Sequence, residues 1–322
     1  MPTIVTPVPR LRALLSALTL ASTLALSVSC TSKAEPTETA GAGQEALDLS
    51  RIVSINGATT EILVELGLKD NIIGVDLSST YPPDMRQRPQ VGYYRNLSDE
   101  GVLGLNPSFI IGEEEAGPAA VIDRLRKSGI QVTLLPLEIS LEGALTRMQA
   151  VANAVGKPDE GKALVERVNQ ELEEALKEPG PAAQEPPRIL GIYARGAGLS
   201  LVSGYGTPYD VAIKLAGGVN AVAAFEAFQP LTPEAVATSE ADVILITDGG
   251  LAALGGIEGL LAVNGIAQTP AGKNRRILAY DDLLLNGLSP RLPQLVRDIR
   301  HNLHEFFPGD AAAETAAEAS VE

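Results

Sequence analysis

The sequence contains few cysteines and histidines, two residue types that catalytic and metal sites often use. Its 322 residues include one cysteine, two histidines and no tryptophan. A single cysteine excludes a disulfide within the chain. His301 and His304 lie three residues apart in a predicted helix and could share a metal ion, but no third ligand lies near them in the sequence. A solvated helix face is therefore the preferred interpretation of this pair.

Motifs of catalysis are also missing. The chain has no Gly-x-Ser-x-Gly nucleophile elbow. Its glycine-rich segments 196–198 and 204–206 are not followed by the Lys-Ser/Thr pair of a phosphate-binding loop, so they are interpreted as tight turns. Carboxylates are numerous, but their spacing in the sequence does not single out any two of them as a catalytic pair. The sequence therefore favours a binding protein, and an enzyme is the minority alternative.

Positive charge is scarce as well. The chain has 25 lysines and arginines and 40 acidic residues, which gives a net charge of −15. An acidic chain repels the phosphate backbone, so no nucleic-acid partner is expected. Aromatic residues make up 4% of the chain although hydrophobic residues make up 45%. This balance indicates an aliphatic core, which is typical of α/β proteins.

The first thirty residues have the layout of an export signal. Arg10 and Arg12 precede an apolar run over residues 13–28, which leads through small residues to Cys30. The run is shorter than the roughly 20 apolar residues of a transmembrane helix. The sequence Leu-Ser-Val-Ser-Cys ending at Cys30 resembles a bacterial lipobox, which implies that this cysteine is lipidated and becomes the first mature residue. We predict an exported, lipid-anchored protein facing the periplasm or the cell exterior, with an ordinary secreted protein as the alternative.

Short apolar strands alternate with helices along the rest of the chain, which indicates parallel sheets built from βαβ units. The predicted strands are 51–55, 71–75, 108–111, 131–135, 188–193, 243–247 and 277–280, and the main predicted helices are 59–66, 119–128, 141–178, 207–216, 232–238 and 290–306. The helical block 141–178 is interrupted at residues 156–158, and its second part is about 20 residues or roughly 30 Å long. We therefore predict an α/β fold of two lobes with mostly parallel central sheets, joined by one long helix.

This pattern divides the chain into six parts. They are a signal peptide (1–29), a flexible tether (30–49), an N-terminal α/β lobe (50–140), a helical connector (141–178), a C-terminal α/β lobe (186–307) and a disordered acidic tail (308–322). The tether and the tail are assigned because their composition cannot bury enough apolar area to offset the cost of ordering.

Two features stand out between the predicted elements. Tyr93 and Tyr94 lie in a loop after a proline-rich segment, and loops on rigid scaffolds often carry binding residues. The alternative is that one ring fills a gap and the other is exposed. Each half also has a short helix that begins at a serine or threonine and carries an early glutamate, Glu100 in the first half and Glu234 in the second. Glutamate is favourable near a helix N-terminus, so this feature has a purely local explanation too.

The sequence resembles the periplasmic haem-binding proteins of bacterial haem ABC importers. The motif Val91-Gly92-Tyr93 with Arg95 carries the resemblance, which spans about residues 51–307. Its further segments are 97–103, 106–107, 115–118, 204–207, 215–220, 253–261 and 287–291. It implies a fold like that of class III substrate-binding proteins, with two lobes bridged by a long rigid helix. It also implies that the transported ligand is haem, with a ferric siderophore or cobalamin as the alternative.

The resemblance assigns the iron of the haem to Tyr93. A phenolate is a hard anionic donor that suits ferric iron. Arg95 is similar to the family's supporting arginine, and a cation beside the phenolic oxygen favours the ionised form. Tyr94 is the alternative ligand, because adjacent side chains in an extended loop point opposite ways.

The second lobe is expected to contribute Arg195. In the family this position faces the cleft, where a cation can bind a haem propionate. Some relatives that hold two haems have a histidine near this position, so an arginine argues against a second haem ligated there. Gly249 occupies a position where some relatives have an arginine. The resemblance therefore does not indicate which other residues of the second lobe contact the haem.

The resemblance also gives Glu100 and Glu234 a second explanation. They match two surface glutamates, one on each lobe, that contact arginines of the permease in this superfamily. Such charge pairs determine orientation and encounter rate more than affinity. The predicted partners are haem, an ABC permease and its ATPase, with the chain itself a monomer and not an enzyme. A redox or degradative haem enzyme would need a distal acid or base, which the sequence does not offer.

Overall fold

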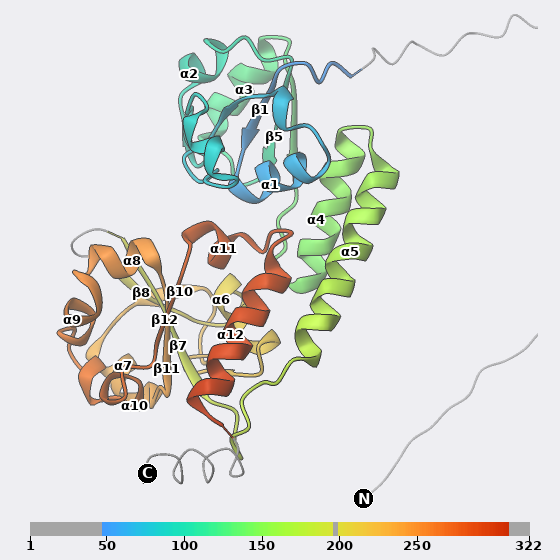
Figure 1. Ribbon diagram of the computed structural model, residues 1–322. Coiled ribbons are helices and arrows are strands. Elements are labelled where there is room, and N and C mark those ends of the chain that lie inside the picture. Colours follow the sequence, from blue (N-terminus) through green and yellow to red (C-terminus); the bar gives the residue numbers. More distant parts are fainter. Residues whose placement is uncertain (1–46, 196–198, 309–322) are drawn as a thin grey trace, which may run out of the picture. The chain divides into compact units, whose positions relative to one another are not determined.

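The computed structural model describes residues 47–195 and 199–308. These residues form two large sheets with their helices, a two-stranded hairpin and a pair of connecting helices (Figure 1). We call the part that carries the first sheet the N-terminal lobe and the part that carries the second sheet the C-terminal lobe. The predicted signal peptide, Cys30, the first 17 residues of the predicted tether and the tail beyond residue 308 lie outside the described residues.

The N-terminal lobe contains a four-stranded, fully parallel sheet in the order β2-β1-β5-β6. Its strands are β1 (Ile52–Ile55), β2 (Ile72–Val75), β5 (Phe109–Glu113) and β6 (Gln131–Leu135). Its helices are α1 (Gly57–Glu65), α2 (Asp99–Leu103) and α3 (Ala119–Lys127), with the 3₁₀ turns η1 (Lys69–Asn71) and η2 (Pro83–Gln87) and the hairpin of β3 (Gly92–Tyr93) and β4 (Asn96–Leu97). The apolar runs of β1 and β5 are buried along their whole length, as expected for strands covered on both faces.

Helix α1 begins two residues before the start that its hydrophobic spacing predicts. The cause is Asn56, whose side-chain Oδ1 accepts a hydrogen bond from the backbone N–H of Ala58 at 2.8 Å. An asparagine at this position satisfies N–H groups that the first turn leaves free, so it fixes where the helix begins. Asn56 is therefore the N-cap of α1.

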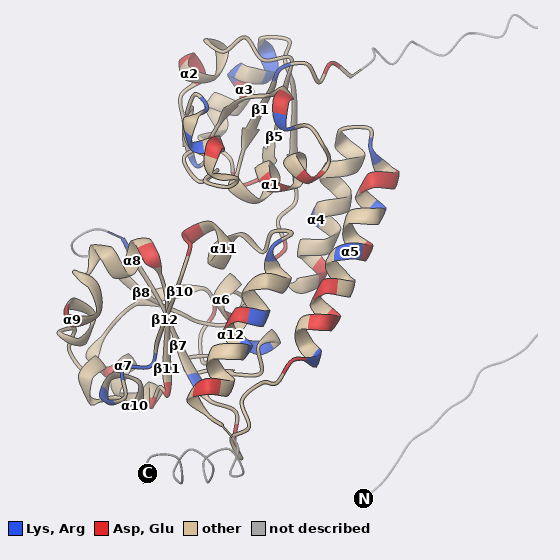
Figure 2. Cartoon of the chain, in the orientation of Figure 1, with Lys and Arg blue, Asp and Glu red and all other residues tan. Residues whose placement is uncertain are grey.

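The connector consists of α4 (Leu141–Ala154) and α5 (Pro158–Lys177), which lie side by side and antiparallel (Figure 1). The predicted interruption is present, because Gly156 adopts a φ of +69° and Pro158 opens the second helix. The expected long helix is α5, and α4 packs along it. Lysine, arginine, aspartate and glutamate mix along α5 (Figure 2), as expected for the solvated face of an amphipathic helix.

The C-terminal lobe contains a six-stranded sheet in the order β10-β8-β7-β11-β12, with β9 also paired to β7. Its strands are β7 (Arg188–Arg195), β8 (Leu199–Ser203), β9 (Val219–Asn220), β10 (Phe228–Pro230), β11 (Val243–Thr247) and β12 (Ile277–Tyr280). Its helices are α6 (Pro208–Leu215), α7 (Pro233–Ser239), α8 (Asp248–Ala253), α9 (Gly256–Leu261), α10 (Pro270–Lys273), α11 (Asp282–Gly287) and α12 (Leu292–Phe306), with the 3₁₀ turn η3 (Ile266–Gln268). The pairs β7–β11, β11–β12 and β7–β9 are parallel, whereas β8 runs antiparallel to both β7 and β10.

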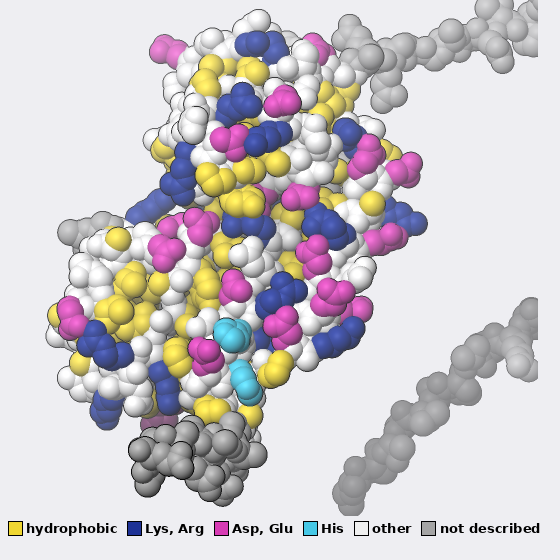
Figure 3. All heavy atoms as spheres, viewed as in Figure 1, with side chains coloured by type: hydrophobic (Ala, Val, Ile, Leu, Met, Phe, Trp, Pro, Cys, Tyr) yellow, Lys and Arg dark blue, Asp and Glu magenta, His cyan; other side chains and the backbone are white. Residues whose placement is uncertain are grey.

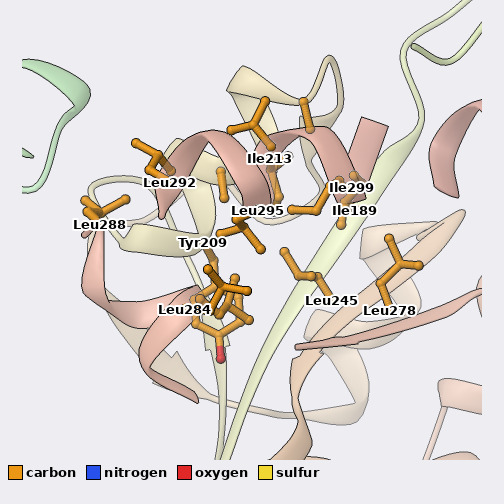
Figure 4. Packing of buried hydrophobic residues seen from close by; sticks show 14 of the residues in the cluster. Ile189, Tyr209, Ile213, Leu245, Leu278, Leu284, Leu288, Leu292, Leu295 and Ile299 are labelled. Carbon is orange, nitrogen blue, oxygen red and sulfur yellow. The ribbon is translucent and has the colours of Figure 1, made fainter. Parts of the chain in front are cut away.

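A dense aliphatic core holds the C-terminal sheet to its helices. Leu295 and Ile299 of α12 pack with Ile213 of α6 and with Leu245 of the sheet (Figure 4). Tyr209 is fully buried in the same cluster. Because α12 also packs on α5, this core continues from the C-terminal lobe into the connector. Among residues 47–195 and 199–308, no helix combines the length and apolarity that crossing a membrane requires.

Candidate functional site

A cavity of about 500 Å³ brings together residues of the N-terminal lobe, the connector and the C-terminal lobe. All four residues that the sequence predicts as ligand contacts line it: Tyr93, Tyr94, Arg95 and Arg195. They come from segments about 100 residues apart in the sequence, since the first three follow β2 and the last ends β7. The carboxyl ends of parallel strands commonly form binding sites in open α/β sheets, and Arg195 lies at such an end.

The tyrosine segment is held by backbone hydrogen bonds on both sides. The N–H of Leu77 donates to the carbonyl of Gly92 at 2.9 Å. The N–H of Gly117 donates to the carbonyl of Tyr94 at 2.9 Å, and the N–H of Leu97 donates to the carbonyl of Gly117 at 2.8 Å. These bonds fix the backbone on both sides of Tyr93, which favours a constant position for its ring.

Gly92 makes this segment possible, because its φ is +99°. An added Cβ would lie 3.2 Å from the carbonyl oxygen of Asn96. We expect Gly92→Ala to lower the free energy of unfolding by about 1–2 kcal/mol, the usual cost of a left-handed conformation for a residue with a Cβ. Urea unfolding measures this. Gly101→Ala in α2, where a Cβ would meet nothing closer than 3.6 Å, is the matched control and should not destabilise the protein. Equal stability of both variants would contradict the role given to Gly92.

The two tyrosine rings lie together and not on opposite sides. Their centroids are 4.5 Å apart, with an interplanar angle of 57°. The expectation that adjacent side chains point opposite ways is therefore wrong here. The segment is a short hairpin with a turn at Tyr94 and Arg95, and a turn does not alternate its side chains as a strand does.

Arg95 forms a hydrogen bond with Tyr94 and not with Tyr93. Its Nε donates to the phenolic oxygen of Tyr94 at 2.9 Å, and its Nη2 forms an ion pair with Glu115. Burial raises the pKa of Tyr94 well above its usual value, hydrogen bonding with Tyr93 adds to this, and Arg95 opposes it. Tyr94 is therefore a neutral phenol at physiological pH. The predicted role of Arg95 as the direct support of the Tyr93 oxygen is not what this geometry favours.

The second cation of the site comes from the other lobe. The guanidinium carbon of Arg195 lies 5.3 Å from the centroid of the Tyr93 ring, within the range of a cation–π interaction. Among the cavity residues that sequence reasoning missed are Arg86 in η2 and Tyr193 on β7. The local signal for Tyr193 is a second Tyr-x-Arg segment, Tyr193-Ala194-Arg195, which matches the spacing of Tyr93 and Arg95.

Apolar side chains form much of the wall. Leu77 and Ile139 line the cavity although 52% and 36% of their surfaces are exposed. Leu201 and Phe228 of the C-terminal lobe lie in the same lining. Exposed apolar surface inside a cavity favours a ligand with a large apolar face.

A buried ion pair lies at the edge of the cavity and links the two lobes. Nη1 of Arg147, on α4, is 2.9 Å from Oε1 of Glu113, and their side chains are 5% and 2% exposed. Nη2 of the same arginine donates to the backbone carbonyls of Gly287 and Leu288 in the C-terminal lobe. Burial raises the pKa of Glu113, and the charge of Arg147 opposes that effect.

A second buried ion pair joins the same lobes. Arg291 donates to both carboxylate oxygens of Glu61 on α1, with a distance of 3.0 Å from Nε to Oε2. Ser289 donates to the same carboxylate at 2.8 Å. The guanidinium of Arg291 also lies 3.7 Å from the centroid of the Tyr81 ring. Both lobes are thus connected through buried, hydrogen-bonded charges.

Comparisons with known proteins identify the family. A profile of the periplasmic binding protein family matches residues 52–283. The chain belongs to this family. The periplasmic haem-binding protein RhuT from Roseiflexus sp. RS-1 is 40% identical, with a TM-score of 0.76, over 80% of this chain and 98% of that protein. The haem-binding protein HutB of Vibrio cholerae is 32% identical, with a TM-score of 0.71, over 80% of this chain and all of that protein.

Other members of the periplasmic binding protein family are similar at lower identity. An uncharacterised ABC transporter substrate-binding lipoprotein of Bacillus subtilis, YvrC, is 24% identical over 256 residues, which is 79% of this chain and 80% of the relative. A vitamin B12-binding protein of Vibrio cholerae is 24% identical over 250 residues, which is 77% of this chain and 87% of the relative. The fold predicted from the sequence is thereby confirmed.

Glu100 and Glu234 occupy equivalent positions in the two lobes of this periplasmic binding protein. Each is the second residue of its helix, after Ser98 or Thr232 as the N-cap. Both glutamates are exposed, and neither forms an ion pair with any residue that the structure describes. Asp99, by contrast, pairs with Arg124. At this position of its short helix, each lobe thus presents an exposed glutamate that forms no ion pair with the described residues.

The two histidines are at the surface of α12 (Figure 3). His301 Nε2 lies 3.3 Å from Glu305, and His304 Nδ1 lies 3.1 Å from the carbonyl of Gly180. Within the described part of the chain, no three histidine, cysteine or acidic side chains are grouped so that they could hold a metal ion. The solvated face remains the preferred interpretation of this pair.

Proposed function

We propose that this protein binds haem in the cavity between Tyr93 and Arg195 and delivers it to the permease of an ABC importer. The observation that carries the proposal is the composition of the cavity. It combines paired tyrosines with the exposed guanidinium of Arg195 and apolar walls. Solved structures of relatives up to 40% identical are described as haem-binding proteins, which supports haem over other ligands.

Tyr93 is the proposed ligand of the haem iron. When bound, the iron would supply a Lewis-acid centre that prefers an anionic oxygen donor. Tyr94 is less suited to this task, because burial raises the pKa of its phenol and keeps it neutral. Arg195, whose guanidinium is exposed in the cavity, would bind a propionate carboxylate. The proposal includes no chemical conversion of the haem and therefore no enzymatic activity.

Cobalamin or a ferric siderophore is the alternative cargo, since vitamin B12-binding proteins are among the relatives. The deciding experiment is a titration of the purified protein with haemin, monitored in the Soret region. We expect a saturable complex with the bands of a tyrosinate-ligated ferric haem. Cyanocobalamin and a ferric catecholate chelate, added in tenfold excess, should not displace the haemin. Absence of the haemin complex together with binding of either competitor would refute the proposal.

Glu100 and Glu234 are the proposed contacts with arginines of the permease, whose ATPase drives import. Their exposure and their equivalent positions on the two lobes support this role. The double variant Glu100→Gln/Glu234→Gln should bind haemin as the wild type does, because neither residue lines the cavity. Haem-dependent growth through the protein's own importer should fall. Unchanged growth would refute docking through these residues.

Export and anchoring are proposed from the sequence. We infer that residues 1–29 are removed, that Cys30 is acylated, and that residues 30–49 tether a monomeric binding unit to the membrane. A Bacillus subtilis relative is named a lipoprotein, which supports this view. Metabolic labelling with palmitate should mark the wild type and not Cys30→Ser. The division into lobes 50–140 and 186–307, connector 141–178 and tail 308–322 remains a proposal as well.

A further inference from the structure

A polar group of the cavity has no part in the function proposed above. The hydroxyl oxygen of Thr80 is buried and has no hydrogen-bond partner among the described residues, although Thr80 lines the cavity. An unpaired buried hydroxyl costs free energy unless it finds a partner, and a ligand can supply one. Thr80 follows β2 in the loop that leads to η2.

Arg86 is bonded to the backbone of the same threonine. Its Nε donates to the backbone carbonyl of Thr80 at 3.3 Å, which holds the guanidinium next to the threonine. Arg86 also lines the cavity, and 58% of its side chain is exposed. The N-terminal lobe therefore places a cation in the cavity wall, bonded to a residue whose buried hydroxyl has no partner among the described residues.

The charge of Arg86 is only weakly neutralised. Its carboxylate neighbour is Asp281 of the C-terminal lobe, with Nη2 and Oδ2 3.8 Å apart. This distance is longer than a hydrogen bond, and an exposed pair of this kind contributes little to stability. Asp281 has other partners, because its Oδ1 caps α11 through the N–H groups of Leu283 and Leu284. Arg86 can therefore exchange Asp281 for a carboxylate of a ligand at small cost.

We propose that Thr80 and Arg86 form a carboxylate subsite that binds one propionate of the haem, opposite the propionate that Arg195 binds. This inference rests on the proposed function and names two specificity residues for the same cavity. Arg86 would donate through its Nη groups, Thr80 through its hydroxyl, and Asp281 would give up its contact with Arg86. One cation from each lobe would then hold the two carboxylates of the ligand.

The test compares haemin with haemin dimethyl ester, which keeps the iron and the macrocycle but has no free carboxylate. Arg86→Gln should weaken haemin binding about tenfold, in line with the loss of one charge-assisted hydrogen bond, and leave the ester unchanged. Thr80→Val, which keeps the shape of the side chain, should weaken haemin about threefold and also spare the ester. Asp281→Asn retains a helix-capping residue and should strengthen haemin binding relative to the ester. Arg126→Gln, an exposed position on α3 outside the cavity, controls for net charge.

Failure of the carboxylate subsite and failure of the proposed function give different results in this experiment. Failure of the wild type to bind either compound with tyrosinate bands would refute the proposed function. Tyrosinate bands together with an unchanged ratio of the two affinities in Arg86→Gln would refute the carboxylate subsite alone. An equal loss of affinity for both compounds would also refute it, because such a loss reports a damaged cavity and not a missing carboxylate contact.

Discussion

Tyr93→Phe should abolish the tyrosinate bands of the haemin complex and lower haemin affinity by at least about 100-fold. Loss of a partner that only supports a metal ligand already costs about 10–100-fold, so loss of the donor atom itself should cost more. The substitution removes one oxygen and keeps the ring. The ring would still pack 4.5 Å from Tyr94 and still face Arg195, so the cavity wall should keep its shape. Soret titration and the charge-transfer bands of the ferric complex measure the effect.

Tyr94→Phe is the matched control for this prediction. It removes an oxygen from the neighbouring ring, together with the hydrogen bond from Arg95. The tyrosinate bands should persist, because burial raises the pKa of Tyr94 and disfavours a phenolate there. If the bands persist in Tyr93→Phe and vanish in Tyr94→Phe, the residue that ligates the iron is Tyr94 and not Tyr93. Bands that persist in both variants would exclude each tyrosine as the sole ligand.

Arg147→Met should lower the free energy of unfolding by about 3–5 kcal/mol, the usual result of removing one partner of a buried ion pair. The carboxylate of Glu113 would stay buried with only the Asn56 side chain as a donor, at 2.8 Å. The carbonyls of Gly287 and Leu288 would lose their donor as well. Urea denaturation of the ligand-free protein measures the change. Arg167→Met, which breaks exposed ion pairs on α5, should cost less than about 1 kcal/mol.

The effect of Arg147→Met should also depend on pH. Burial already raises the pKa of Glu113, and the variant lacks the cation that opposes this shift. A carboxyl group with a raised pKa in the folded state binds its proton more tightly when folded than when unfolded. The folded variant therefore gains stability relative to its unfolded state as the pH falls through that pKa towards the ordinary value of 4.5. The difference from the wild type should shrink on acidification, and a difference that grows would contradict this account of the ion pair.

The strands of both sheets could be predicted largely from short apolar runs. β6 and β12 span the residues that the sequence predicts, because each is a short apolar segment between turn residues. β8 and β10 were missed, since β8 alternates leucine with serine and β10 ends in proline. These strands form at the antiparallel edge of the sheet, where one exposed face permits such sequences. Their partners are distant in the sequence, so local periodicity carries little information about them.

The residues of the cavity also differ in whether the sequence could predict them. The motif around Tyr93 is local, so the sequence could indicate its residues. Arg147 and Glu113 resemble ordinary surface charges in the sequence, and only the fold brings them together across 34 residues. Arg86 gave no signal either, because its place in the cavity depends on the loop between β2 and β3. The contacts of Arg95 could not be predicted, since they follow from a turn that aligns two adjacent rings.

The buried charges that join the lobes have a consequence for the thermodynamics of cargo uptake. Arg147 and the pair of Glu61 with Arg291 connect the lobes through groups of the protein alone. Contacts that form without the ligand reduce the share of the binding free energy that is consumed in bringing the lobes together. The same contacts slow spontaneous discharge, because parting the lobes would break the hydrogen bonds that Arg147 and Arg291 make across them. We therefore expect the importer to supply the free energy that separates the lobes. The rate of ligand release would then be set by the importer and not by this protein alone.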